Sequence, residues 1–128
     1  MKLHADPRST HHTVTAYGPG QVSIDGQPYA RSLLLLPDRI DAGWGPAAFA
    51  ALAAEHLAGL AGLACDVILL GTGAHQRFPA PALLRPLIEA GRGVEVMDTP
   101  AACRTYNVLV AEGRRPAAAL IVEQETGA

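Results

Sequence analysis

The stretch GRGVEVMDTPAACRTYNVLVAEGR, residues 91–114, predicts a β-strand that runs directly into an α-helix. Residues 94–97 are rich in valine, which is typical of strands. Pro100 suits the first turn of a helix, where its missing N–H needs no partner, and Gly113 suits the residue that follows a helix. We therefore predict that a helix begins at Pro100, capped by Thr99, and ends just before Gly113.

Earlier segments extend this pattern of strands that alternate with helices. Residues 32–36 and 66–70 are almost continuously apolar, as in strands covered on both faces, and the first of them is expected at the centre of the sheet. Helices are predicted over residues 46–60 and 81–90, and a last strand over residues 117–122. Such alternation is typical of a mixed, largely parallel sheet.

Two details refine the predicted helices. In the first, Phe49, Ala53, Leu57 and Leu60 recur at helical spacing and would form one buried stripe. In the second, Pro86 lacks the N–H that would bond to the residue four before it. This helix is therefore expected to be kinked or to start late.

The amino-terminal part of the chain predicts an antiparallel meander. Residues 13–17 and 21–25 alternate between apolar and polar side chains, as half-buried strands do. Asp25 and Gly26 supply the two positive-φ residues that favour a tight hairpin. The meander is expected to precede the larger sheet.

Length and composition limit the class of protein. The 128 residues fit one domain, which we place at residues 13–125 after an irregular tail at residues 1–12. A net charge of −2 with dispersed basic residues disfavours nucleic-acid binding. Because no apolar run is long enough for a membrane span and no targeting signal is visible, we expect a cytoplasmic protein. Cys65 and Cys103 are expected to be free thiols, although one disulfide between them stays open.

The residues around the predicted helix start are the strongest site candidates. Free N–H groups and the positive end of the helix dipole meet Asp98 there, so an anion could bind. Alternatively, Asp98 and Thr99 bond to these groups themselves as capping residues. Gly71, Thr72 and Gly73 (the 71–73 turn) follow a strand as a phosphate loop does, but they lack the third glycine of a dinucleotide motif and also fit a tight turn. Because ligands bind outside the carboxyl ends of strands in open α/β sheets, the two segments could share a crevice.

Polar side chains on the predicted helix have alternative interpretations. The helix dipole and Arg104 could activate the Cys103 thiol, or Cys103 could be a small residue buried against the sheet. Thr105, Tyr106 and Asn107 lie around more than one helix face, so we expect some of them to bond to loops, with the 71–73 turn as one candidate.

Catalytic and metal sites are not assigned. His75 is the one histidine that we would test as an acid or base, since it adjoins the 71–73 turn. The histidines lack metal-ligand spacing, so we expect neither a metal nor a cofactor. The candidate binding residues are Gly71, Thr72, Gly73, Asp98, Thr99, Cys103, Arg104, Thr105, Tyr106 and Asn107.

Several short segments match a known family: Gly26, Tyr29, Trp44, Ala102 and residues 32–37, 70–73, 78–79, 93–99, 105–107 and 112–114. Through them the chain resembles the small family of unknown function with a Mth-type domain, which includes mitochondrial complex I assembly factor three and the adipogenesis-associated Mth-type domain protein. The resemblance implies a three-layer α/β fold, in which helices flank a central mixed sheet and an N-terminal β-hairpin or meander is added. It supplies no catalytic residues.

Two functional hypotheses follow. By analogy with the mitochondrial relative, which acts by binding partners, the first is a non-catalytic interaction or assembly module whose partner surface includes the exposed part of residues 98–114. The alternative is a small-ligand-binding protein or enzyme that uses the crevice between the 71–73 turn and Asp98-Thr99, with Cys103 or His75 as its reactive group. The sequence leaves the partner and the oligomeric state open.

Overall fold

The computed structural model describes residues 1–3 and 10–124. The strands are β1 (Val14–Gly18), β2 (Gln21–Ile24), β3 (Gln27–Tyr29), β4 (Leu33–Leu36), β5 (Arg39–Asp41), β6 (Val67–Gly71), β7 (Val94–Met97) and β8 (Pro116–Leu120). The helical elements are the 3₁₀ turn η1 (Phe49–Ala51), α1 (Ala54–Ala58), α2 (Pro81–Glu89) and α3 (Thr99–Ala111). Residues 4–9 of the predicted tail and the last residue of the predicted domain, residue 125, lie outside the described residues.

The larger sheet is mixed, as predicted, with the strand order β5-β4-β8-β6-β7. Strand β6 pairs parallel with β7 and β8, whereas β4 pairs antiparallel with β5 and β8. The sheet is therefore less parallel than the sequence indicates. All four leucines of β4 are buried, which confirms a strand covered on both faces, but the central position belongs to β8.

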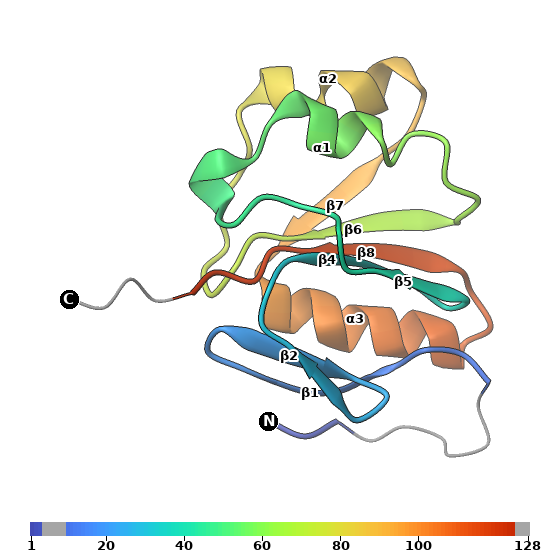
Figure 1. Cartoon of the computed structure of the whole chain (residues 1–128). Helices are drawn as coiled ribbons and strands as arrows, with labels where there is room; N and C mark the ends of the chain where they lie inside the picture. Colours follow the sequence, from blue (N-terminus) through green and yellow to red (C-terminus); the bar gives the residue numbers. More distant parts are fainter. Residues whose placement is uncertain (4–9, 125–128) are drawn as a thin grey trace.

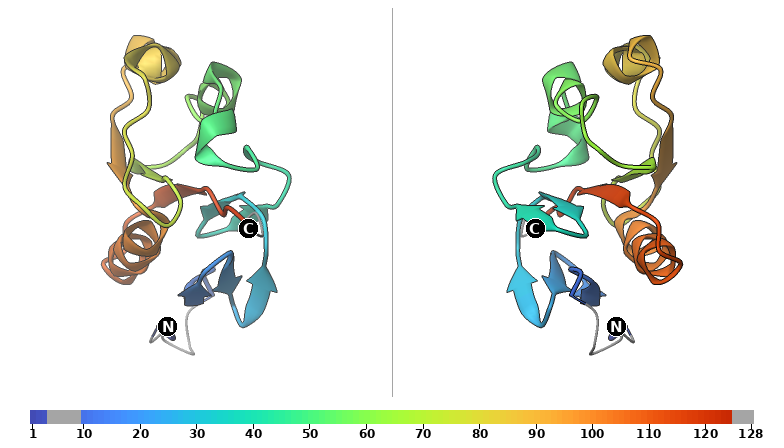
Figure 2. Two further views of the ribbon diagram at one scale, coloured as in Figure 1. Left: turned by 90° about the vertical axis from the view of Figure 1, so that its left-hand side faces the viewer. Right: turned by 90° about the vertical axis from the view of Figure 1, so that its right-hand side faces the viewer.

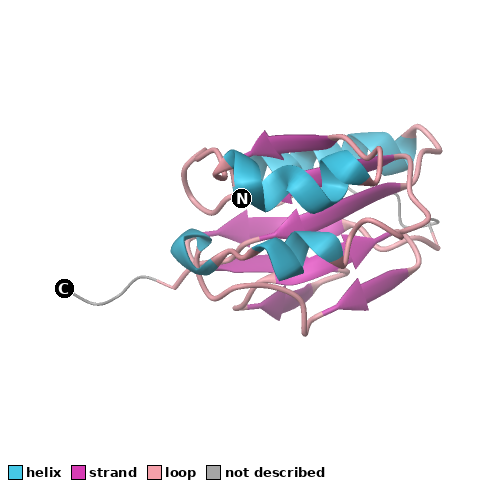
Figure 3. Ribbon diagram, turned by 90° about the horizontal axis from the view of Figure 1, so that it is seen from above, coloured by secondary structure: helices cyan, strands magenta, loops and turns pink. Residues whose placement is uncertain are grey.

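Helices cover both faces of this sheet (Figure 1), and Figure 3 looks onto the face that α1 and α2 cover. Leu34 and Leu36 of β4 belong to the core that packs under α1 and α2. Leu33 and Leu35 belong to the opposite core, together with residues of α3 and the amino-terminal meander. Because successive side chains of a strand point to opposite faces, one leucine run supplies both cores. The predicted three-layer α/β fold is confirmed.

The predicted helix over residues 46–60 is wrong. The segment instead holds η1 and the short α1, separated by Leu52 in an extended conformation. Long-range contacts fix this break, because the Phe49 N–H donates to the Glu123 carboxylate at 2.9 Å and the Trp44 indole donates to the His56 carbonyl at 3.0 Å. Leu57 and the later part of the predicted stripe are still buried, so the apolar pattern was informative although its single helix was not.

Other elements differ from prediction in smaller ways. Helix α2 begins at Pro81 and contains Pro86, so it does not start late. Strand β5, which follows a turn at Pro37-Asp38, was not predicted because it has only three residues. Helix α3 begins one residue earlier than predicted, and Gly113, at φ 80°, follows its end as expected. The boundaries shifted while the strand–helix order was retained.

The meander contains β1, β2 and β3 in antiparallel pairs. Asp25 and Gly26 have φ values of 53° and 83°, which confirms the predicted hairpin turn. Within the predicted tail, the Leu3 N–H donates to the Thr15 carbonyl, and Lys2 forms an antiparallel β-bridge with Ala16. Residues 1–3 therefore run beside β1.

Helix α3 contacts the meander and holds it against the larger sheet. The helix and the meander lie side by side on the same face of that sheet (Figure 2). Asn107 accepts a hydrogen bond from the Val14 N–H at 2.9 Å and donates one to the Val14 carbonyl at 2.7 Å. The Tyr106 hydroxyl donates to the His12 carbonyl at 2.8 Å. The predicted bonds from this helix to loops therefore exist, but they reach the meander instead of the 71–73 turn.

Asn107→Leu should destabilise the protein, because the N–H and carbonyl of fully buried Val14 would lose their partners. We expect the free energy of unfolding, measured in urea, to fall by about 2–4 kcal/mol. Val108→Thr on the same helix is the control, because this side chain is exposed and its change should stay within about 0.5 kcal/mol. Equal stabilities for Asn107→Leu and the unaltered protein would contradict this role.

Candidate functional site

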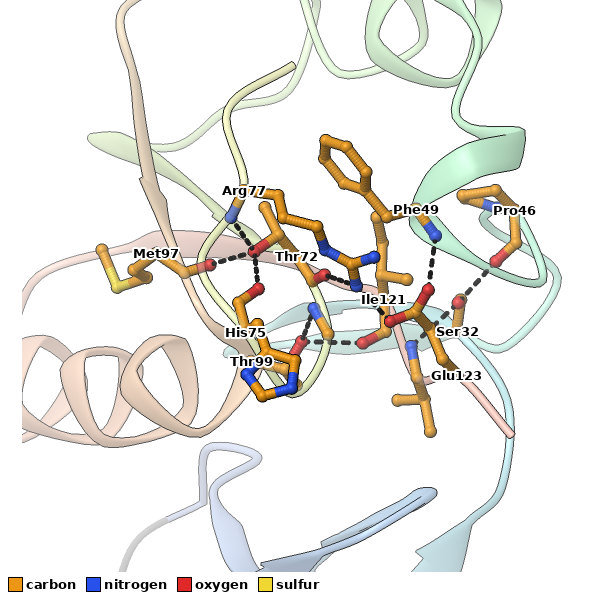
Figure 4. Close-up of polar contacts among 12 residues, drawn as sticks. Ser32, Pro46, Phe49, Thr72, His75, Arg77, Met97, Thr99, Ile121 and Glu123 are labelled. Atoms are coloured by element: carbon orange, nitrogen blue, oxygen red, sulfur yellow. Dashed lines mark hydrogen bonds and ion pairs between the residues drawn. The ribbon is translucent and has the colours of Figure 1, made fainter. Parts of the chain in front are cut away.

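The carboxyl ends of β6, β7 and β8 meet at one edge of the sheet, where three buried hydroxyls lie (Figure 4). Thr72 follows β6, Thr99 follows β7, and Ser32 precedes the antiparallel β4. Their exposed fractions are 0%, 6% and 4%. Buried hydroxyls need hydrogen-bond partners, and each of these has both a donor and an acceptor nearby.

Thr99 connects all three strand ends. Its Oγ1 accepts a hydrogen bond from the Gly73 N–H at 2.8 Å and donates one to the Ile121 carbonyl at 2.7 Å. The Thr99 N–H also donates to the Gly73 carbonyl at 2.8 Å. Thr99 is therefore not the capping residue that the sequence predicts. Asp98 caps α3 instead, accepting from the Ala101 N–H at 2.7 Å, as the capping interpretation of Asp98 predicts.

The 71–73 turn is a tight structural turn. A Cβ on Gly71 would lie 2.9 Å from the Thr99 Cα, so only glycine allows this approach. The Thr72 hydroxyl donates to the His75 carbonyl at 2.7 Å and accepts from the Arg77 N–H at 3.1 Å. Because the turn bonds directly to Thr99, no crevice separates these two segments in the described structure.

Arg77 and Glu123 form an ion pair beside the three hydroxyls, which the sequence did not predict. The Arg77 guanidinium also donates to the Thr72 carbonyl at 2.9 Å and lies 4.9 Å from the centre of the Phe49 ring. Its buried Nε has no hydrogen-bond partner in the described structure. A charged residue directly after the buried residues 116–122 was the available signal, but 46 residues separate the pair.

Cys103 and Tyr106, two of the polar residues predicted on α3, are buried in the core. Cys103 is fully buried, and burial raises the pKa of its thiol to about 12 despite the nearby Arg104 charge. Burial and the raised pKa therefore favour the interpretation of Cys103 as a small residue buried against the sheet over that of a reactive thiol. Burial also raises the pKa of Tyr106, and Asp25 and Asp38 act in the same direction.

The remaining candidates lie at or near the surface. Arg104 is exposed and donates to the Tyr17 hydroxyl at 2.6 Å, while Thr105 is half-buried. The His75 side chain is exposed. Both Cys65 and Cys103 are free, as predicted.

Residues 1–3 and 10–124 contain neither a metal-binding cluster nor a membrane-spanning helix. No three His, Cys, Asp or Glu side chains in this part of the chain gather closely enough to hold a metal ion. Within the same residues, no helix has the length and apolar character needed to cross a bilayer.

A hollow of about 450 Å³ lies beside the junction of the 71–73 turn with Thr99. Gly73, Ala74, Thr99 and Pro100 form one wall, and residues 17–22 of the β1–β2 hairpin form the facing wall. Residues 121–123 and Met1 complete the lining. The predicted crevice thus has a counterpart, but its second wall comes from the meander.

The chain is similar in sequence to a known protein family and to several named relatives. The family described as "Protein of unknown function (DUF498/DUF598)" matches residues 14–121. Assembly factor 3 of the NADH dehydrogenase [ubiquinone] 1 alpha subcomplex from Danio rerio is 34% identical over 110 residues, which cover 84% of this chain and 63% of that protein. The match to the Bos taurus protein of the same name covers 44% of this chain and 30% of that protein. The chain thus spans less than two thirds of these relatives.

Solved structures show the same fold. A crystal structure of a Bordetella parapertussis protein is 40% identical, with a TM-score of 0.81, and the match covers 91% of this chain and all of that one. A solution structure from Bordetella pertussis, described as a Mth938-like domain, is 35% identical with a TM-score of 0.74. That match covers 98% of this chain and 94% of the other.

Thr99→Val should destabilise the strand edge, because it keeps the shape of the side chain but removes its hydroxyl. The Gly73 N–H and the Ile121 carbonyl would lose their partner, which should lower the free energy of unfolding by about 2–4 kcal/mol. Thr99→Ser is the matched control, since it keeps the hydroxyl and should cost about 1 kcal/mol for the lost methyl group. A larger loss for Thr99→Ser than for Thr99→Val in urea titrations would refute the role of the hydroxyl.

Cys103 should resist alkylation in the folded protein, because its thiol is buried and stays protonated at mildly alkaline pH. Half-buried Cys65 should react with iodoacetamide first, and both thiols should react after unfolding in urea. Mass spectrometry of the peptides measures each site. Faster labelling of Cys103 than of Cys65 in the folded state would contradict the buried role and favour the reactive-thiol hypothesis.

Proposed function

This chain belongs to the DUF498/DUF598 family of proteins of unknown function, which contains Mth938-like domains and relatives named as complex I assembly factor 3, and we propose that it is a non-catalytic protein-binding module. The name of the Danio rerio relative describes an assembly factor, and assembly requires binding to other proteins. Because this chain spans only part of that relative, the proposal concerns binding and not a particular complex.

The observation that carries the proposal is the exposure of Phe78. Its side chain is 75% exposed, although it lies between two fixed residues. Arg77 before it is held by Glu123 and the Thr72 carbonyl, and Pro79 after it is buried. An aromatic ring on such a fixed base loses little conformational entropy on binding, and aromatic residues are enriched at energetically dominant interface positions.

The polar residues support binding over catalysis because their groups already serve the fold. Asp98 caps α3, Thr99 joins strand ends, Asn107 holds Val14, and the Cys103 thiol is buried. A catalytic nucleophile needs an adjacent base and access to substrate. These four side chains do not provide that combination.

A second candidate binding surface, separate from Phe78, lies on α3, within the segment that the sequence also suggested. Val108 is 56% exposed, and Arg104 lies one turn before it on the same face of the helix. Helix α3 and helix α2, which follows Phe78, lie on opposite faces of the sheet (Figure 1). Single substitutions can therefore test the two faces separately. The cytoplasmic location and any link to a respiratory NADH dehydrogenase remain predictions.

We expect affinity capture from the native cells to recover a defined protein whose yield falls at least tenfold with Phe78→Ser, since dominant interface residues contribute about 2 kcal/mol or more. Quantitative mass spectrometry measures the yield. Recovery of NADH dehydrogenase subunits would support the respiratory link.

Ile88→Ser is the matched control, because Ile88 is also exposed, at 65%, but lies near the far end of α2. Val108→Ser reports on the α3 surface. If Phe78→Ser and Ile88→Ser recover the same proteins in the same amounts, Phe78 is not the binding surface. Failure to enrich any protein over an unrelated bait would count against the module itself.

A further inference from the structure

The 450 Å³ hollow between the β1–β2 hairpin and the strand edge has the size of a small-molecule site, since such sites span roughly 300–1,000 Å³. It is separate from the Phe78 surface, because Phe78 is not among its lining residues. Its two walls come from parts of the chain that are distant in sequence, so the meander completes it.

The walls are suited to an apolar ligand because several of their polar groups already have partners. Thr99 binds the Gly73 N–H and the Ile121 carbonyl, and the Ser32 hydroxyl accepts from the Val122 N–H at 3.0 Å. The Glu123 carboxylate is paired with Arg77 and with a backbone N–H. What remains for a ligand is mainly carbon surface, including Pro19, Val22 and Pro100.

Two cationic groups lie near the hollow: the Met1 ammonium, which donates to the Tyr17 carbonyl, and the Arg104 guanidinium. Arg104 follows the lining residue Pro100 by one helical turn, so the two share a face of α3. Its guanidinium donates to the hydroxyl of Tyr17, another lining residue, and lies 5.8 Å from the centre of that ring. Within the described part of the chain Arg104 has no carboxylate partner. A guanidinium has five N–H donors, so several stay available to a ligand.

The hollow is held open by contacts to both walls. Gln124 donates to the carbonyl of Gly20 at the tip of the hairpin at 2.8 Å and also to the Ala30 carbonyl. Asn107 fixes β1, and Thr99 fixes the opposite wall. A site that exists before binding avoids the entropy cost of ordering its walls.

From these observations we propose that the hollow binds a small amphiphilic carboxylate, meaning a molecule with an unbranched apolar chain and one carboxylate group. The chain lies between the β1–β2 hairpin and the wall formed by Gly73 and Pro100, while the carboxylate pairs with Arg104 at the rim. Charge complementarity and the satisfied polar lining select this class over neutral polar molecules and over cations.

The test titrates the whole protein, labelled with nitrogen-15, with decanoate and with decanol, and follows amide shifts by NMR. We expect saturable shifts centred on Gly18, Gly20 and Gly73, and tighter binding of decanoate than of decanol. Arg104→Gln should weaken decanoate binding about threefold to fivefold, the size expected for one exposed ion pair, and should leave decanol binding unchanged. Ala74→Trp, which fills the hollow from an exposed lining position, should weaken both at least tenfold.

Arg114→Gln is the control for the loss of a positive charge, because Arg114 lies beyond the opposite end of α3 and should not alter either affinity. The spectra of all variants also report whether the fold is retained. The proposal is overturned if decanoate produces no saturable shifts at millimolar concentration, if the shifts lie away from the hollow, or if Arg104→Gln binds decanoate as the unaltered protein does.

Discussion

The rest of this structure depends on the two hydrogen bonds that the Thr99 hydroxyl makes, with the Gly73 N–H and the Ile121 carbonyl. The hydroxyl joins the turn after β6 to the chain after β8, and Thr99 itself follows β7, so one oxygen fixes three strand ends. The absence of a Cβ at Gly71 permits the close approach. The position of α3 follows from this junction, and Asn107 on α3 then places the meander. Both walls of the hollow are therefore set by the same few hydrogen bonds.

The concentration of polar side chains around the start of α3 has a structural explanation. A hydroxyl or carboxylate that satisfies buried backbone groups cannot also act on a substrate without leaving those groups unpaired, which would cost free energy. Asp98 and Thr99 are committed in this way. Function in this chain is therefore better sought at exposed groups such as Phe78 and Arg104, which the fold holds in place but does not cover.

Local sequence signals predicted much of the fold and less of the site. The apolar runs gave β4 and β6, and Asp25-Gly26 gave the hairpin turn, because these features depend on near neighbours. The helix over residues 46–60 failed because the Phe49 N–H bonds to Glu123, 74 residues away. Thr99 was given the wrong role for a similar reason, since its partners lie 26 and 22 residues away. The rules that identify capping residues use only neighbouring positions in the sequence, so they cannot predict contacts between distant residues.

The Arg77–Glu123 ion pair links the two proposed binding surfaces. Glu123 lines the hollow, and Arg77 directly precedes the exposed Phe78. A ligand that shifts Glu123 must also change the contacts of Arg77, whose buried Nε has no hydrogen-bond partner among the described residues. Any coupling through this pair would be reciprocal, so a protein bound at Phe78 would alter affinity in the hollow by the same factor. Arg104 approaches the hollow from the Tyr17 side, and its removal therefore separates ligand binding in the hollow from partner binding at Phe78.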